Sequence, residues 1–321
     1  MFMDKLLRVN GLCTSFKIAG KFFAAVDDFC VDIYRNEVFA IVGESGSGKS
    51  AMALSLTKLH NPNYTRIEGE VIYDGRNLIS MNETELNAIR GSHIGMIFQD
   101  SLFALNPLLQ IGSQIEESLF YHSNLDKAER RARAMGLLEE VGIIRRAYSQ
   151  LPHELSGGMR QRVMIAIAVA CKPDLIIADE PTTALDVTIQ STILELLKKL
   201  QEDRAASIIL ITHDLGVVAE IADRVGVMYA GQLVEIAGVY DLFNNPMHPY
   251  TRSLLASMPR GESDRLSTIS GSVPPLQNMP KYGCRFALRA PWIPERMHER
   301  NPKRHEISPG HFVMCTCYLW R

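Results

Sequence analysis

The chain has 321 residues, enough to bury a full core and carry an appended element, and its 34 Lys and Arg nearly balance its 36 Asp and Glu. This balance excludes the broad basic surface typical of proteins that bind nucleic acid, and no apolar run approaches the roughly 18 residues that a membrane span requires. The sequence begins with no charged and apolar leader, and its six cysteines are too scattered for a disulfide scaffold, so we expect a protein of the reducing cytoplasm.

The first chemically distinctive segment is a glycine-rich loop. It follows the apolar run Val38–Val42, which has the composition of a strand buried on both faces. The loop itself, Gly43–Ser50, fits the pattern G-x-x-x-x-G-K-[ST], and a helix is predicted to begin at Ala51. Glycines let the backbone curl so that several N–H groups face one anion, and the helix N-terminus adds partial positive charge. We therefore predict a phosphate site, in which Lys49 reaches the β- and γ-phosphates and the Ser50 hydroxyl binds Mg²⁺.

The residues assigned to this phosphate site come from the loop and from the start of the helix. They are Gly43, Glu44, Ser45, Gly46, Ser47, Gly48, Lys49, Ser50 and Ala51. Taken alone, the string also fits an ordinary glycine turn. The strand before it, the helix after it and the segments downstream favour the phosphate site.

The middle of the chain changes from strands to helices. Up to about Phe98 the sequence predicts strands and the phosphate loop, and from Asp100 to about Ala170 it predicts mostly helix. In Leu155-Ser156-Gly157-Gly158-Met159, the serine and glycines precede an apolar helical segment and predict a second anion site at a helix N-terminus. Without further context, Ser-Gly-Gly before a helix is simply a common cap.

Two acidic residues follow a second buried strand, Leu175–Ala178. Adjacent carboxylates at the end of an apolar strand are costly unless a cation or a reaction uses them. We predict that Asp179 binds Mg²⁺ and that Glu180 is the general base that polarises the attacking water. The alternative is that both acids merely cap the following turn.

A histidine follows the third buried strand, Ser207–Thr212. A lone histidine is usually a satisfied polar group. Ligands of open α/β folds, however, bind at the carboxyl ends of the strands, where Lys49, Asp179 and Glu180 are also expected. We therefore predict that His213 donates a hydrogen bond to the γ-phosphate and keeps the water aligned with its base.

Taken together, these segments resemble those of the ATP-binding cassette (ABC) ATPases. The most specific one is Leu155–Arg162, which resembles the family signature LSGGQ with Met159 in place of Gln. The resemblance implies an α/β fold of the P-loop NTPase class, with a RecA-like core, an antiparallel β subdomain and a helical subdomain at about residues 100–170. It also implies that Ser156, Gly157, Gly158 and Met159 contact the γ-phosphate held by an opposite subunit, so that ATP joins two cassettes.

The resemblance assigns further residues. Gln99 matches the glutamine that senses Mg²⁺ and the attacking water and links the core to a membrane partner. Asp186, in Ala184-Leu185-Asp186, matches the loop that crosses the dimer interface. Phe16 is the candidate for the aromatic ring that stacks on adenine, with Phe22 and Phe23 as alternatives. The implied catalytic residues are Lys49, Gln99, Glu180 and His213, and the implied Mg²⁺ ligands are Ser50, Gln99 and Asp179.

The sequence changes character near Pro259, after which prolines crowd an irregular tail, and their density opposes long helices and central strands. We predict an ABC nucleotide-binding domain over residues 1–258 and an extension over residues 259–321. Three segments, Asn245–Thr251, Gly271–Pro274 and Gly283–Arg289, resemble the C-terminal region of oligopeptide and dipeptide permease ATPases, which is sometimes also seen in nickel importers.

In many of these relatives the tail carries four cysteines spaced to hold an iron–sulfur cluster, which needs about four thiolates. Here Cys284 matches the first position, and Cys315 or Cys317 the last. The two middle positions hold Ala290 and Met297, which supply no thiolate. We therefore expect no iron–sulfur cluster.

The combined reading is an ATP-hydrolysing subunit of an ABC importer that couples ATP binding and hydrolysis to peptide uptake. The expected cofactors are ATP and Mg²⁺. The expected partners are a second, homologous ATPase in a heterodimer, two transmembrane permease subunits and, indirectly, a solute-binding protein. The chain would lie peripherally on the cytoplasmic face of the cell membrane. The alternatives are an importer of nickel or another small solute, and a non-transport ABC ATPase.

Overall fold

The computed structural model describes residues 4–182, 187–258, 269–280, 283–292, 294 and 303–314. The chain forms two compact units. The first consists of Met1–Tyr34, Val38–Ser80 and Thr212–Arg321, and the second consists of Arg35–Glu37 and Met81–Ile211. The long second segment is therefore inserted between two parts of the first unit. None of the helices in the described part of the chain combines the length and the apolar composition that a membrane span needs.

The elements of the first unit are, in chain order, β1 (Lys5–Ile18), β2 (Lys21–Tyr34), β3 (Val38–Val42), α1 (Lys49–Leu56), β4 (Thr65–Tyr73), β5 (Arg76–Asn77), η1 (Leu78–Ser80), α8 (Leu215–Ile221), β9 (Arg224–Tyr229), β10 (Gln232–Gly238), α9 (Val239–Asn244), α10 (Pro249–Ala256), η4 (Leu276–Asn278), η5 (Ala287–Arg289), β11 (Arg304–Ser308) and β12 (His311–Met314). Those of the second unit are α2 (Glu83–Ile89), β6 (Ile94–Ile97), α3 (Ser101–Ala104), α4 (Ile111–His122), α5 (Lys127–Glu140), η2 (Arg145–Ser149), η3 (Pro152–Glu154), α6 (Gly157–Ala168), β7 (Leu175–Asp179), α7 (Val187–Arg204) and β8 (Ser207–Ile211).

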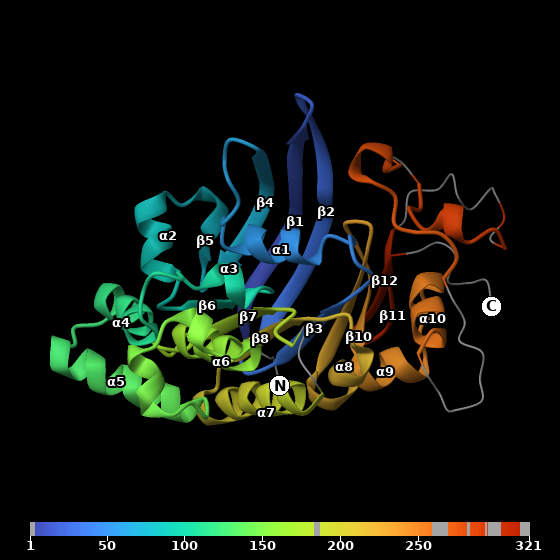
Figure 1. The fold of residues 1–321 in the computed structure, drawn as a ribbon. Helices are drawn as coiled ribbons and strands as arrows, with labels where there is room; N and C mark the ends of the chain where they lie inside the picture. The colour runs from blue at the N-terminus through green and yellow to red at the C-terminus, as the bar shows by residue number, and fades with distance from the viewer. Residues whose placement is uncertain are drawn as a thin grey trace. The chain divides into compact units, whose positions relative to one another are not determined.

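An antiparallel sheet forms one part of the first unit, with the strand order β2-β1-β4-β5 (Figure 1). Its two long strands, β1 and β2, meet in a tight turn in which Ala19 and Gly20 both have positive φ, as a two-residue hairpin turn with the right-handed strand twist requires. Leu12 and Val26, on facing strands, are completely buried. This sheet matches the predicted antiparallel β subdomain.

The other strands of this unit pair side by side, beginning with β3, the strand that leads into the phosphate loop. All five residues of β3 are buried and apolar, and β3 pairs in parallel with β9, which continues through antiparallel β10 and β12 to β11. The prolines of the tail argued against a central strand, yet β12 lies between β10 and β11. The reason is local, because Pro309 and Gly310, the latter with φ 79°, occupy the turn between β11 and β12, where a proline does not interrupt the hydrogen bonding of a strand.

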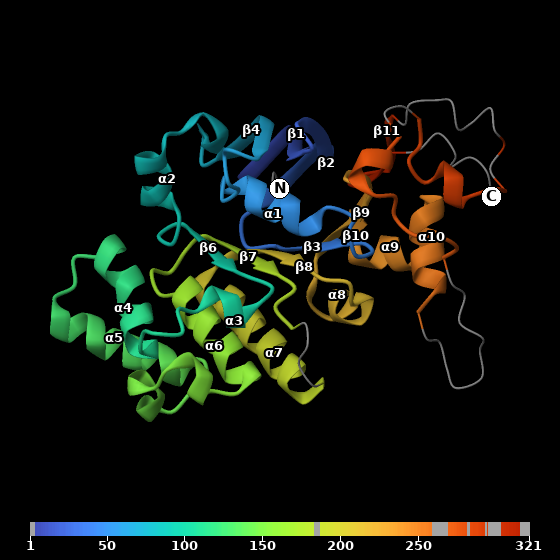
Figure 2. The same cartoon turned by 45° about the horizontal axis from the view of Figure 1, so that its top comes forward.

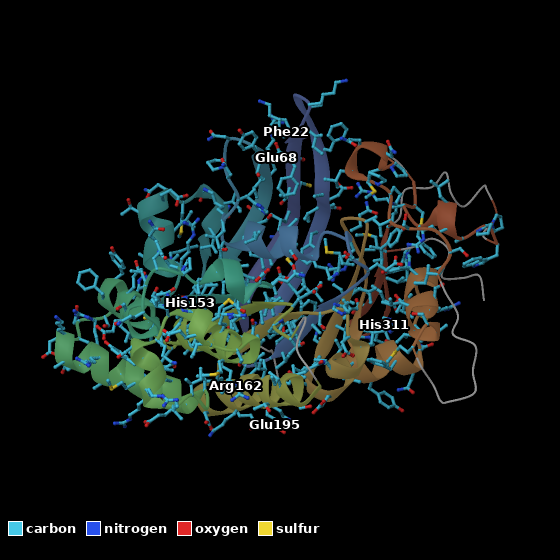
Figure 3. The ribbon with its side chains drawn as sticks, in the orientation of Figure 1. Phe22, Glu68, His153, Arg162, Glu195 and His311 are labelled. Carbon is cyan, nitrogen blue, oxygen red and sulfur yellow. The ribbon has the colours of Figure 1, made fainter. Side chains whose placement is uncertain are left out.

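A buried polar cluster ties β12 to the rest of the first unit. The Glu235 carboxylate, on β10, accepts hydrogen bonds from His311 Nε2 at 2.8 Å and from the backbone N–H groups of Met247 and His248 at 2.7 and 2.8 Å. Figure 3 labels His311 where β12 lies against β10. Burial by itself would raise the pKa of Glu235, but these hydrogen bonds lower it below its usual value. The cluster therefore favours an ionised carboxylate inside the fold.

His248 makes the stability of this region depend on pH. Burial lowers the pKa of His248 from 6.5 to about 4, with smaller effects from Glu235, which raises it, and Arg252, which lowers it. Between pH 6.5 and about pH 4, the imidazole of His248 is protonated in the unfolded chain but neutral in the folded chain. The contribution of His248 to the free energy of unfolding is therefore fully present above pH 6.5 and decreases as the pH is lowered. From pH 7 to pH 5 we expect the free energy of unfolding to drop by about 2 kcal/mol through this residue.

Urea denaturation at the two pH values measures this drop. The matched variant is His248→Asn, because its side-chain oxygen can replace Nδ1 as the acceptor of the Tyr250 N–H, which lies 3.0 Å away. The variant should lose about 2 kcal/mol less than the wild type over the same interval. Equal losses in both proteins would contradict the assignment to His248.

The second unit combines a short parallel sheet with helices. β7 pairs in parallel with β6 and with β8, and α6 packs against α3, α4 and α5 (Figure 2). The prediction of helix from about residue 100 to 170 is confirmed. The helix α2 was not predicted, although Asn82 and Glu85 form a capping box at its start, which is a readable signal for a helix N-terminus.

Candidate functional site

The phosphate loop connects β3 to α1, as predicted, but the helix begins at Lys49 rather than Ala51. Two loop positions accept only glycine. Gly48 has φ 98°, and a Cβ there would lie 2.5 Å from the Ala25 carbonyl oxygen. At Gly43 a Cβ would lie 2.1 Å from the carbonyl oxygen of Met228. The backbone of the loop therefore packs closely against β2 and β9, and its two glycines permit that close approach.

The loop offers positive groups and unused donors. Lys49 is only 5% exposed, and its Nζ donates hydrogen bonds to the carbonyl oxygens of Gly43 and Glu44 at 2.8 and 3.0 Å. Among the described residues, no acceptor is found for the backbone N–H groups of Gly46, Gly48 and Ser50. The first turn of α1 also contains no acidic residue that would oppose an anion. These features fit a phosphate chain.

The buried hydroxyl of Ser47 provides an independent test of this fit. Its Oγ has no hydrogen-bond partner within the described part of the chain, although the Ser47 backbone is fixed by bonds to Glu44 and Gly231. A buried hydroxyl without a partner is costly. A phosphate oxygen bound by the loop is a suitable acceptor for it.

Glu44 anchors the loop to the C-terminal part of the chain. Its backbone N–H donates to the hydroxyl oxygen of Tyr250, in α10, at 2.9 Å. Its carboxylate accepts two hydrogen bonds from Arg289, in η5, at 2.6 and 3.1 Å. Sequence reasoning did not find these contacts. Tyr250 and Arg289 both lie in segments that resemble the C-terminal region of the permease ATPases, but this resemblance does not indicate which residues they contact.

The three candidate phenylalanines lie on two different faces of the antiparallel sheet. Phe16 pairs with Phe23 across β1 and β2, so these two side chains share a face. Phe22, which lies near the tip of the hairpin (Figure 3), pairs with Lys17 and therefore lies on the other face. The Phe16 and His60 rings are nearly perpendicular, with 5.2 Å between their centroids, and His60 Nε2 lies 2.8 Å from the Ala51 carbonyl oxygen of α1. Phe16 and Phe23 therefore face α1, and Phe22 does not.

In the second unit, the two acidic candidates end strand β7. Asp179 is 4% exposed. Glu180 has φ 46°, a left-handed conformation that is uncommon for a residue other than glycine, and its N–H donates to the Ile211 carbonyl oxygen at 2.9 Å. Gln99 Nε2 donates to Glu180 Oε2 at 3.0 Å. The structure thus brings together Gln99 and Glu180, whose direct contact was not predicted.

The signature serine begins helix α6. Ser156 is the N-cap residue, and its Oγ accepts the N–H of Met159 at 3.3 Å. Gly158 lies against α7, because a Cβ there would lie 2.8 Å from the side chain of Ile189. Ser156 is exposed, so this helix N-terminus faces solvent within its unit. The assigned residue Asp186, with Ala184 and Leu185, lies outside the described residues.

His213 belongs to the first unit and is exposed after Thr212. The next residue, Asp214, caps α8 by accepting the N–H groups of Gly216 and Val217 at 2.8 and 3.3 Å. A capped helix thus fixes the backbone just after His213. Of the assigned residues, Phe16, the phosphate loop and His213 lie in the first unit, and Gln99, Ser156–Met159, Asp179 and Glu180 lie in the second.

The residues considered for an iron–sulfur cluster are only partly described. The Cys284 thiol is half-buried, and Ala290 is completely buried. Met297, Cys315 and Cys317 lie outside the described residues. The expectation of no cluster stays a prediction.

Family models match two segments of the chain. The model described as "ABC transporter" matches residues 26–183, and "Oligopeptide/dipeptide transporter, C-terminal region" matches residues 234–292. The second match begins within β10, before the predicted boundary between residues 258 and 259, and that boundary stays a prediction.

Curated proteins and solved structures give the same result. The chain is 53% identical over 318 residues, covering 98% of this chain and 94% of the relative, to the oligopeptide transport ATP-binding protein OppD of Lactococcus lactis subsp. cremoris (strain SK11). It is 50% identical over 321 residues, 98% of each chain, to the oligopeptide transport ATP-binding protein AppD of Bacillus subtilis (strain 168). The dimeric post-hydrolysis structure of the ATP-binding cassette MJ0796 with ADP and Pi matches with a TM-score of 0.66 and 32% identity, over 73% of this chain and 98% of that one. The predicted P-loop NTPase fold is confirmed, and the chain belongs to the ABC transporter family, among the ATP-binding proteins that carry the oligopeptide/dipeptide transporter C-terminal region.

Proposed function

We propose that this chain is the ATP-hydrolysing subunit of an ABC importer that couples ATP binding and hydrolysis to the uptake of peptides. One observation carries the proposal: a phosphate-binding loop around Lys49 occurs in the same chain as a match to the oligopeptide/dipeptide transporter C-terminal region. The first feature supplies nucleotide chemistry, and the second is shared with relatives named for oligopeptide transport.

In this proposal, different residues bind the phosphates, the adenine and the Mg²⁺ of one nucleotide. The loop N–H groups and Lys49 bind the β- and γ-phosphates, and Phe16 stacks on adenine. Ser50, Gln99 and Asp179 would hold Mg²⁺, which supplies charge neutralisation for the leaving phosphate. These roles rest on the family resemblance and on the fit of the loop to a phosphate chain.

Hydrolysis needs a base and a group that keeps the water in place. Glu180 takes a proton from the attacking water, and Gln99, which donates to Glu180 Oε2 at 3.0 Å, orients the carboxylate. His213 donates to the γ-phosphate and holds the water in line. The left-handed backbone at Glu180 is consistent with a functional position, where strained conformations concentrate.

The proposed assembly is a pair of ATPases beneath two membrane subunits. Ser156, Gly157, Gly158, Met159 and Asp186 would complete the nucleotide site of a second, similar ATPase. Closure on ATP and release after hydrolysis would drive the membrane subunits through alternating access, with peptide delivered by a solute-binding protein. The chain would then act peripherally at the cytoplasmic face of the membrane. The dimeric structure of the similar MJ0796 cassette supports the pairing.

Uptake by cells tests the proposed cargo. Deleting the gene for this chain in its host should abolish uptake of a radiolabelled tetrapeptide, and a plasmid copy should restore it. Uptake of ⁶³Ni²⁺ in the same cells should stay unchanged. Loss of nickel uptake with intact peptide uptake would instead identify an importer of nickel, and loss of neither would favour an ABC ATPase outside transport.

A further inference from the structure

A buried arginine of the C-terminal region contacts the phosphate loop. The Arg289 side chain is 6% exposed, and its Nη1 and Nη2 donate to the two carboxylate oxygens of Glu44 at 2.6 and 3.1 Å. Its Nε donates to the Ser270 carbonyl oxygen at 2.7 Å, and Nη2 also reaches the carbonyl oxygens of Ile269 and Gly271. The planar guanidinium therefore binds the Glu44 carboxylate in the bidentate geometry typical of arginine–carboxylate pairs. The backbone carbonyl oxygens of residues 269–271 fix the orientation of the guanidinium.

Its partner, Glu44, is an acidic residue inside a loop that is built for anions. The Glu44 carbonyl oxygen accepts a hydrogen bond from Lys49 Nζ, so the carboxylate belongs to the same short turn as the phosphate-binding ammonium. An unpaired carboxylate there would repel a polyphosphate and compete with it for the lysine. Arg289 removes that repulsion by neutralising the charge and holding the carboxylate towards the tail.

An aromatic cluster fixes Arg289 in place. The ring centroid of Phe286, one helical turn earlier, lies 5.2 Å from that of Tyr229 and 5.4 Å from that of Tyr250, and all three side chains are almost completely buried. Tyr250 also accepts the backbone N–H of Glu44 through its hydroxyl. The hydrogen bonds to Glu44 raise the pKa of Arg289 above its usual value, so the guanidinium stays charged. The C-terminal region, which the family model matches over residues 234–292, therefore holds Glu44 through both its side chain and its backbone.

We propose that Arg289 is a positioning residue for nucleotide binding, which neutralises Glu44 and makes the affinity of the phosphate loop for ATP depend on the docked C-terminal region. This inference rests on the proposed ATPase function and adds to it a role for the tail. The contact lies entirely within the first unit.

A double-mutant cycle separates charge neutralisation from packing. Arg289→Met is made with Glu44 present and in a Glu44→Gln background, and the dissociation constant of the non-hydrolysable analogue AMP-PNP is measured by competition with a fluorescent nucleotide. With Glu44 present the loss of affinity should be about tenfold, and in the Glu44→Gln background less than about twofold. The loss should be smaller for ADP, which has fewer charges, and should shrink at high salt, because salt screens the repulsion.

Two further variants guard against a simple folding defect. Arg289→Lys loses most of the contacts with carbonyl oxygens but keeps the positive charge. Because the proposed role depends on that charge, this variant should keep AMP-PNP affinity within about threefold of the wild type. Arg285→Met is the matched control, because Arg285 is an equally buried arginine of the same segment that pairs with Asp27 instead. Whatever affinity it loses should be the same with Glu44 present and in the Glu44→Gln background.

The outcomes distinguish the possibilities. Equal losses for Arg289→Met in both backgrounds, or no loss in either, would overturn the neutralising role. An Arg289→Lys variant as weak as Arg289→Met would also overturn it, because packing contacts would then dominate. If the wild-type protein itself binds neither AMP-PNP nor ADP, the proposed ATPase function fails and this inference fails with it.

Discussion

Replacing Glu180 by glutamine is expected to lower the rate of ATP hydrolysis by about a thousandfold while leaving ATP bound. Glutamine has the shape of glutamate but cannot accept a proton from the attacking water. The neighbouring geometry should survive, because the Glu180 backbone N–H keeps its bond to Ile211 and Gln99 can still donate to the side-chain oxygen. Phosphate release by the chain, purified together with its partner ATPase, measures the effect.

The same substitution should favour an ATP-held pair. Without hydrolysis the nucleotide stays between the two ATPases, so size-exclusion chromatography with ATP and Mg²⁺ should show more of the dimer than in the wild type. Glu195→Gln is a matched control, since Glu195 is an exposed glutamate of α7 in the same unit (Figure 3). It should leave both turnover and assembly unchanged. Normal turnover in Glu180→Gln would remove Glu180 from the role of base.

The sequence predicts those parts of the fold that depend on local pattern. The three apolar runs at β3, β7 and β8 form strands whose bounds lie within one residue of those predicted. The residues predicted to bind nucleotide follow directly after these runs. The cap at Ser156 is equally local, because the side chain needs only an N–H three residues ahead. Such features could be predicted because all their determinants are adjacent in the chain.

Features that depend on distant partners could not be predicted. Arg289 and Glu44 are 245 residues apart, and no spacing rule brings them together. The choice among Phe16, Phe22 and Phe23 needs the strand register, which assigns Phe22 to the opposite face of the sheet. The left-handed backbone at Glu180 is likewise invisible in a residue type that seldom adopts it. In each case tertiary structure, rather than local preference, determines the geometry.

Replacing Lys49 by methionine is expected to weaken ATP binding by about a hundredfold, because a charge-assisted hydrogen bond to phosphate is lost. Methionine retains much of the length of the apolar stem, so the main change is the loss of the ammonium group. The substitution also removes the two bonds from Nζ to the carbonyl oxygens of Gly43 and Glu44, which now hold the loop closed. Titration with a fluorescent ATP analogue measures the dissociation constant.

A second lysine separates the binding role of Lys49 from its structural one. Lys58 follows the same helix, and its Nζ also donates to a backbone carbonyl oxygen, that of Ile79, at 2.9 Å, but it lies outside the phosphate loop. Lys58→Met should therefore lower the thermal unfolding midpoint by a few degrees and leave nucleotide affinity unchanged. If Lys49→Met binds ATP as tightly as Lys58→Met does, the glycine-rich loop is a structural turn and the phosphate must be bound elsewhere. If only Lys49→Met loses affinity, the Lys49 ammonium acts in nucleotide binding in addition to its two bonds to the carbonyl oxygens of Gly43 and Glu44.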